Sequence, residues 1–152
     1  MSDADSIETQ TVDAMLAALR AIPGVRGVQE CEPPSALDTA NLPYIWLDVG
    51  DVPPPLGDAG VGYIGGHAWY ELTVTAYGAY KAAAVDVKRV GREFIAQQQF
   101  AIMHAFVASV PDVREAGHSY GQSITAGVGG TQATWIVKYK RLRNDPFRGV
   151  DR

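Results

Sequence analysis

The stretch Trp69–Tyr77 constrains the fold more than any other part of the sequence. Successive side chains of a β-strand point to opposite faces of a sheet. The even-numbered side chains of this stretch are mainly apolar and the odd-numbered ones mainly polar: Tyr70, Leu72, Val74 and Ala76 against Glu71, Thr73, Thr75 and Tyr77. Aromatic and β-branched residues with this alternation favour a strand. We therefore expect the central strand of a sheet, with one face toward a helix and the other toward water or a partner.

Two segments have the apolar periodicity of amphipathic helices. The first is expected over Ser6–Ala21, with Asp5 as its N-cap. The second is expected over Lys81–Val110. Gly91 would permit a kink or break there, because glycine costs about 1 kcal/mol relative to alanine inside a helix. The polar run Gln97–Gln99 is expected on or near the wet face of this helix.

Four further segments have the composition of strands, and the Gly-rich turn before the last of them favours a hairpin. They are Val25–Glu30, Tyr44–Val49, Ser119–Ala126 and Thr131–Leu142. The predicted fold class is α+β, with a mixed, largely antiparallel five-stranded sheet and two helices packed on one face. The expected core residues on these elements are Leu16, Leu19, Tyr70, Leu72, Val74, Phe94, Ile102, Phe106, Trp135 and Val137.

A chain of 152 residues is long enough to bury about 70% of its unfolded surface in one domain, so residues 1–152 are expected to form a single domain. The segment Asp51–His67 is rich in glycine and proline and is expected to be a mobile loop. It is not a phosphate loop, because no Gly-Lys-Ser/Thr follows and a strand comes next. Residues 144–152 are expected to form an extended tail, with Pro146 ending the strand pattern.

The residue types that carry catalysis or bind metals are not in recognisable patterns. Cys31 is the only cysteine, which excludes an internal disulfide or a multi-cysteine zinc site. His67, His104 and His118 lie far apart and match no metal-ligand spacing. Ser123 is not in a nucleophile elbow. The sequence therefore predicts no enzyme, no cofactor and no metal site, although carboxylates that are distant in the sequence could still meet in space.

The charge of the chain is segregated along the sequence. Residues 1–80 carry a net charge of −9 and residues 81–152 a net charge of +5. Segregated charge steers association, although a chance distribution over a well-mixed surface would give the same totals. No apolar run approaches the roughly 18 residues of a membrane span, and the acidic N-terminus lacks the basic region of a signal peptide. A soluble intracellular protein without a membrane partner is expected.

The order of elements is a helix, three strands, a long helix and two strands, with a Pro-Gly break after the first helix. The most informative stretches are Val12–Val25, Glu32–Pro34, Pro43–Val49, Trp69–Tyr77 with the helix that follows, and Trp135–Arg143 with the Asn-Asp-Pro sequence after it. In this layout the chain resembles the tail-terminator (tail-completion) proteins of long-tailed bacteriophages. The likeness covers most of the chain and is one of layout, not of a signature motif.

This resemblance implies a structural virion protein without catalytic residues. Such a protein is made in the host cytoplasm, forms a hexameric ring at the head–tail junction, caps the tail tube and joins it to the head. Its partners would be further copies of itself, the tail tube protein and a head-closure or connector protein, and DNA would pass through the ring without sequence-specific binding. Two alternatives stay open: another neck or tail component, such as a head-closure or tube protein, and a small α+β enzyme or ligand-binding domain.

Head-to-tail contact between unlike surfaces closes a ring when the rotation permits. We therefore expect an acidic surface from the first half of the chain to contact a basic surface from the second half. The acidic candidates are Glu30, Glu32, Asp48 and Asp51. The basic candidates are Lys138, Lys140, Arg141, Arg143 and Arg148, a run that would also suit a solvated edge or phosphate contacts. Tyr63 and Trp69 are candidate aromatic anchors where a neighbour orders the loop.

Overall fold

The computed structural model describes residues 5–31, 39–54, 67–106, 112–142 and 145–149. It has the predicted α+β fold, with a mixed, mostly antiparallel sheet and two α-helices. The elements in chain order are α1 (Ile7–Arg20), β1 (Gly27–Glu30), the short 3-10 helix η1 (Thr39–Asn41), β2 (Tyr44–Val49), β3 (His67–Lys81), α2 (Val87–Phe106), β4 (Asp112–Thr125), β5 (Val128–Leu142) and β6 (Asp145–Gly149).

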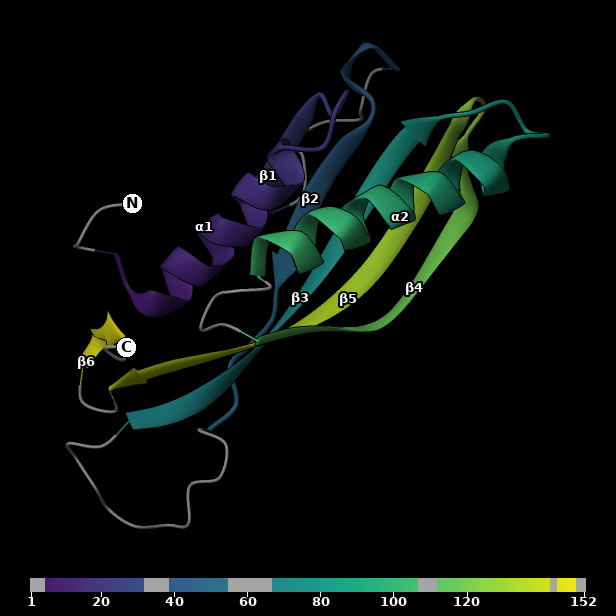
Figure 1. The fold of residues 1–152 in the computed structure, drawn as a ribbon. Helices are drawn as coiled ribbons and strands as arrows, with labels where there is room; N and C mark the ends of the chain where they lie inside the picture. The colour runs from purple at the N-terminus through teal and green to yellow at the C-terminus, as the bar shows by residue number, and fades with distance from the viewer. Residues whose placement is uncertain (1–4, 32–38, 55–66, 107–111, 143–144, 150–152) are drawn as a thin grey trace.

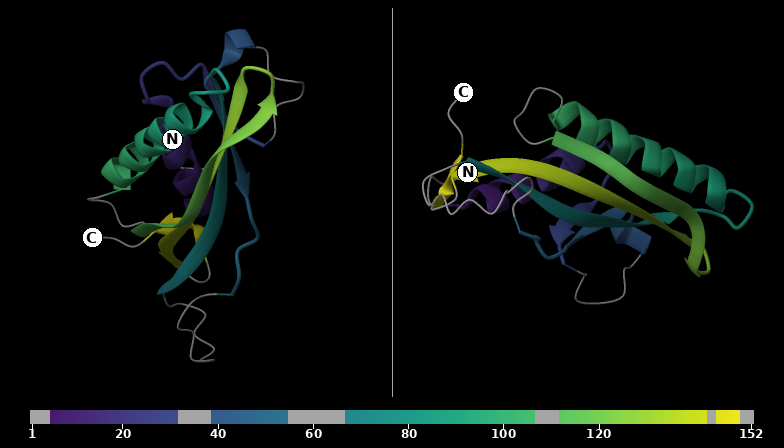
Figure 2. Two further views of the ribbon diagram at one scale, coloured as in Figure 1. Left: turned by 90° about the vertical axis from the view of Figure 1, so that its right-hand side faces the viewer. Right: turned by 90° about the horizontal axis from the view of Figure 1, so that it is seen from below.

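The strand order across the sheet is β1-β2-β3-β5-β4, and β6 pairs with the end of β5. Only β1 and β2 are parallel; the other pairs are antiparallel. Both helices lie on the same face of the sheet, as predicted (Figures 1 and 2). Helix α1 lies at the β1 side of this layer, and α2 lies over β4 and β5.

The core lies between the helices and the inward face of β3 and β5. The two strands pair along 15 residues each, and the register places Leu72 opposite Val137 and Val74 opposite Trp135. These four side chains are completely buried. All ten of the predicted core residues are buried, so the predicted strand faces are confirmed.

Helix α1 begins at Ile7, one residue later than predicted, and its N-cap is Ser6 instead of Asp5. The Ser6 hydroxyl accepts a hydrogen bond from the Thr9 backbone N–H at 3.1 Å, which satisfies one of the free donors of the first turn. Both residues can cap a helix, so composition alone did not distinguish them.

Helix α2 differs from the prediction in two ways. It begins at Val87 and not at Lys81, since β3 extends through Lys81 and a short connection precedes the helix. It also passes through Gly91 without a break. Gln98 is completely buried and does not lie on the wet face. Its amide nitrogen donates to the Thr131 hydroxyl of β5 at 3.4 Å, whereas its amide oxygen is buried without a hydrogen-bond partner among the described residues.

The strands at the C-terminal end are longer than predicted. β4 begins at Asp112, and the hairpin turn is confined to Ala126 and Gly127, so that Gly129 and Gly130 are residues of β5. The tail includes a sixth strand, β6, which contains Pro146. Proline is tolerated in a strand at the edge of a sheet, because its backbone nitrogen is not needed there as a hydrogen-bond donor to a neighbouring strand.

Gly91 allows Tyr80 to connect β3 to α2. The Tyr80 hydroxyl donates to the Val87 carbonyl oxygen at 2.6 Å, in the first turn of the helix. A Cβ atom at Gly91, or at Gly129 of β5, would overlap the Tyr80 phenol. The glycine in the helix is therefore required by close packing, and it does not mark a hinge.

Replacement of Gly91 by alanine is expected to destabilise the protein, although alanine favours a helix by about 1 kcal/mol. The new methyl group would displace Tyr80, and overpacking of this kind costs about 1–3 kcal/mol. Chemical denaturation would measure the difference in the free energy of unfolding.

The Tyr80→Phe background supplies the control for this substitution. The hydroxyl oxygen of Tyr80 is the atom nearest to the new methyl group. Gly91→Ala should therefore lower the free energy of unfolding less in the Tyr80→Phe protein than in the wild type. Ala96→Gly, at an exposed position of the same helix, should show the ordinary propensity effect. A Gly91→Ala protein more stable than the wild type would contradict this account.

Candidate functional site

The start of β3 and the end of β5 run past α2 as a pair of strands, which we call the β3–β5 arm (Figure 1). Its residues are 67–71 and 138–142. On its outward side, Trp69 faces Lys140 across the strands, and the Lys140 ammonium lies 5.7 Å from the centroid of the Trp69 ring. Four predicted interface residues lie on the arm: Trp69, Lys138 and Lys140 on its outward side, and Arg141 on its inward side.

On the inward side of the arm, aromatic rings and charges stack. The Arg141 guanidinium carbon lies 4.1 Å from the centroid of the Tyr70 ring, and Tyr70 stacks on Tyr139 with centroids 5.6 Å apart. The Tyr139 hydroxyl donates to a Glu8 carboxylate oxygen at 3.1 Å, which connects the arm to α1. Burial, and then the negative charge of Glu8, raise the pKa of Tyr139, so this phenol stays protonated and donates.

A cavity of about 510 Å³ opens beside this stack. It is lined by Ser6, Glu8, Val52, Pro53, Pro54, Tyr70, Tyr139, Arg141 and Pro146. The polar groups described here bind one another: the Tyr139 phenol binds the Glu8 carboxylate, and the Arg141 guanidinium lies over Tyr70. Proline and aromatic surfaces are typical of protein contacts, and this arrangement provides no activated nucleophile among the lining residues.

The sheet face opposite the helices carries a row of cross-strand contacts. Trp46 of β2 stacks on Tyr77 of β3 with ring centroids 5.6 Å apart. Asp48 is exposed on β2. Lys138 pairs in register with Glu71 on one side and Asp112 on the other. Two carboxylates of the same sheet therefore lower the net positive charge around Lys138, a feature that sequence reasoning missed because β4 was expected to begin later.

The structure places only some of the remaining interface candidates. Glu30 is exposed at the end of β1, and Asp51 is exposed just after β2. Glu32, Tyr63 and Arg143 lie outside the described residues, as does the side chain of Arg148, whose backbone is in β6. Most of the predicted 51–67 loop also lies outside the described residues, and His67 opens β3.

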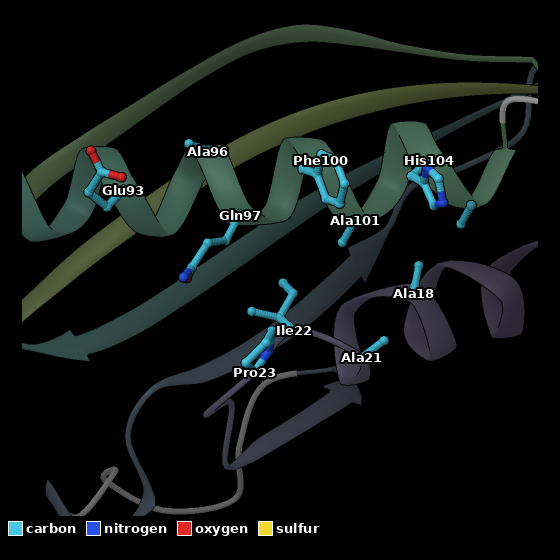
Figure 3. Close-up of a pocket in the computed structure, with 11 residues that line it drawn as sticks. Ala18, Ala21, Ile22, Pro23, Glu93, Ala96, Gln97, Phe100, Ala101 and His104 are labelled. Atoms are coloured by element: carbon cyan, nitrogen blue, oxygen red, sulfur yellow. The ribbon is translucent and has the colours of Figure 1, made fainter.

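A groove of about 480 Å³ separates the outer surfaces of α1 and α2 (Figure 3). Five of the eleven lining residues are alanine, and Ile22, Pro23 and Phe100 add to the apolar surface. Phe100 is 72% exposed and stacks on His104 with centroids 5.4 Å apart. Glu93 and His104 lie at opposite ends of the groove, three helical turns or about 16 Å apart, so they cannot share a proton. The groove is an apolar surface, not an acid–base site.

A polar cluster connects β4 to α2. A Glu115 carboxylate oxygen contacts the His118 Nδ1 atom, and the other accepts a hydrogen bond from the Gln99 amide at 2.6 Å. Residues three apart normally face opposite sides of a strand. A register shift between Glu115 and Gly117, where Gly117 has φ of 129°, brings both side chains to the helix side. This bulge is the reason that sequence periodicity did not reveal the cluster.

In the described parts of the chain, no group of three or more His, Cys, Asp or Glu side chains is placed to hold a metal ion. Neither described α-helix is long and apolar enough to cross a lipid bilayer. No protein-family model matches the chain, and a comparison with curated proteins found no significant match. The resemblance to tail terminators therefore stays a prediction from the layout.

Tyr139 predicts a loss of stability at high pH. A tyrosine in the unfolded chain ionises with a pKa of about 10, whereas the raised pKa of Tyr139 keeps its hydroxyl protonated in the folded protein. Above a pH of about 10 the folded state therefore binds more protons, and the free energy of unfolding falls as the pH rises. The contribution is fully present below that pH.

Urea denaturation of the wild type and Tyr139→Phe at about pH 8 and about pH 11 would test this. At the lower pH the variant should be less stable by about 1–3 kcal/mol, because a hydrogen bond to a carboxylate is lost. At the higher pH the difference in the free energy of unfolding between the two proteins should become smaller. Burial also raises the pKa of Tyr80, but this residue is present in both proteins and affects them equally. A gap that does not change with pH would contradict the assignment.

Proposed function

We propose that this chain is a structural virion protein of a long-tailed bacteriophage, acting as a tail terminator. In this function, copies assemble into a ring, with six as the expected number, at the head–tail junction. One side of the ring caps the tail tube protein, the other contacts a head-closure or connector protein, and DNA passes through without sequence-specific contacts. The protein is made in the host cytoplasm and resides in the virion.

The observation that carries the proposal is the sheet face without a helical layer. In the described part of the chain, both helices pack on one face of the sheet and leave the other open. An antiparallel sheet can face water on one side when that side is polar. Here the open face includes Trp46, Trp69, Tyr77 and Ile136, with Trp69 36% exposed. Tryptophan and tyrosine are enriched in protein interfaces, so this face suits contact with another protein.

The polar clusters of the described residues support a structural function over an enzymatic one. The Tyr139–Glu8 hydrogen bond connects α1 to the arm, and the contacts of Glu115 connect α2 to β4. Each of these groups is engaged in holding two elements together. The cavity beside the arm and the groove between the helices are lined mainly by apolar or mutually bonded side chains.

Purified protein mixed with purified tail tubes would test the proposal. We expect rings at one end of each tube in electron micrographs, and assembled protein that sediments with the tubes. The double variant Trp69→Ser/Ile136→Thr should bind tubes about tenfold more weakly or worse, because buried aromatic anchors dominate interface energies. The matched control is Phe100→Ser, which removes a more exposed aromatic ring from the helical layer and should bind like the wild type.

A wild-type protein that stays monomeric and unbound in the presence of tubes would refute the terminator function. Equal weakening by Phe100→Ser and by the double variant would show that the open sheet face is not the contact surface. Thermal denaturation of each variant would confirm that it is folded before the comparison is made.

A further inference from the structure

An acidic groove lies between α1 and the β1 edge of the sheet. Its volume is about 390 Å³. Three carboxylates line it, together with Val12, Leu16 and Val49: Glu8, Asp13 and Glu30. We call it the α1–β1 groove. The cation on α1 itself, Arg20, donates to the Val28 carbonyl oxygen at 3.1 Å and does not line the groove, whereas Glu8 also lines the cavity that contains Arg141. A groove with an apolar base and a carboxylate rim suits a long cationic side chain, because its apolar stem can be buried while its charge reaches the rim.

Three exposed cations lie in the first half of α2: Lys88, Arg89 and Arg92, which we call the α2–β4 flank. Lys88 and Arg92 contact β4, whereas Arg89 lies about 100° round the helix from Lys88 and is exposed to solvent. The Arg92 Nε atom donates to the Tyr120 hydroxyl of β4 at 3.2 Å, which orients the guanidinium and raises its pKa. The Lys88 stem lies close to Gly121. Three acidic residues lie near this flank. Glu115 is engaged with His118 and Gln99, Glu93 is close enough to contribute to the raised pKa of Arg92, and Asp86 is exposed just before the helix begins.

The acidic groove and the cationic flank lie at opposite edges of the sheet. The strand order begins with β1 and ends with β4, and Figure 1 shows α1 and α2 arranged in the same sense. Two complementary surfaces at opposite edges can meet when a second copy is placed beside the first. Repetition of such a heterologous contact closes a ring if the rotation permits.

The sheet edge itself is unsuited to direct strand pairing between copies. β4 has three register shifts in its pairing with β5, and β1 is only four residues long. Bulges and short edge strands prevent edge-to-edge addition of strands. Contact between copies at these edges would therefore use side chains of the helical layer, where the opposite charges are found.

We infer that the α1–β1 groove of one copy receives the α2–β4 flank of the next copy in the ring. This inference rests on the proposed self-assembly and specifies its interface. It differs from an interface through Lys138, whose charge is flanked by Glu71 and Asp112. Complementary charges accelerate encounter and select one register of docking, and the contact weakens as salt screens them.

A charge-swap experiment on the full chain tests the inference. One variant, Asp13→Lys/Glu30→Lys, makes the groove basic; the other, Lys88→Glu/Arg89→Glu, makes the flank acidic. These positions spare Glu8 and Arg92, which form hydrogen bonds within the subunit. Each variant alone should associate at least about tenfold more weakly than the wild type, because two attractive contacts become repulsive.

Mixing the two variants in equal amounts should restore assembly. The basic groove of the first variant then meets the acidic flank of the second, and the unaltered flank of the first meets the unaltered groove of the second. An even-membered ring of alternating subunits satisfies every contact. Sedimentation velocity at low and high salt would measure the assembled mass, with Arg26→Glu, an exposed reversal outside both surfaces, as the control.

The outcomes separate the interface from the function. Weak association of each variant, normal association of Arg26→Glu and recovery in the mixture would support the pairing of groove and flank. Variants that assemble like the wild type, or a mixture that fails to assemble, would overturn this pairing. The proposal that the wild type forms a ring would not be affected by either result. A wild-type protein that never assembles, with or without tail tubes, would overturn both.

Discussion

The antiparallel pairing of β3 with β5 is the interaction on which the rest of the structure depends. It runs without a register shift from His67 opposite Leu142 to Lys81 opposite Val128, about 50 Å of continuous ladder. This register places the apolar side chains of both strands on one face, and a slip of one residue would expose all of them. Both helices pack on the apolar face that results. The open face, the arm and the two sheet edges are consequences of the same pairing.

A small number of polar contacts place the helices on this sheet. Tyr80 connects β3 to the first turn of α2, and Tyr139 connects β5 to α1 through Glu8. Glu115 and Tyr120 of β4 bind Gln99 and Arg92 on the side of α2 that faces β4. These contacts separate α1 toward the β1 edge and α2 toward the β4 edge. Because α1 carries Glu8 and Asp13 and the N-terminal half of α2 carries three cations, the helical layer is more acidic at the β1 edge and more basic at the β4 edge.

The sequence predicted the features that follow from short-range periodicity. The alternation in Trp69–Tyr77 sufficed for the strand faces and the core, and the helical spacing placed both helices. The features that were missed depend on partners distant in the sequence or on irregular backbone. Gln98 lies on the buried side of α2, where its amide donates to Thr131 of β5. The bulge before Gly117 brings Glu115 and His118 together, and the early start of β4 places Asp112 beside Lys138. The interface candidates were chosen by charge alone, so their distribution between faces and edges could not be predicted.

Self-association is the central claim of this account, since a ring is needed both for capping the tube and for pairing the two edges. Native mass spectrometry of the wild-type protein over a range of protein concentrations tests it most directly. We expect one discrete closed oligomer, with a mass that is a whole-number multiple of 16.3 kDa and six as the expected multiple, which dissociates as ionic strength rises. A spectrum of monomer alone at every concentration and at low ionic strength, with tail tubes present or absent, would contradict it.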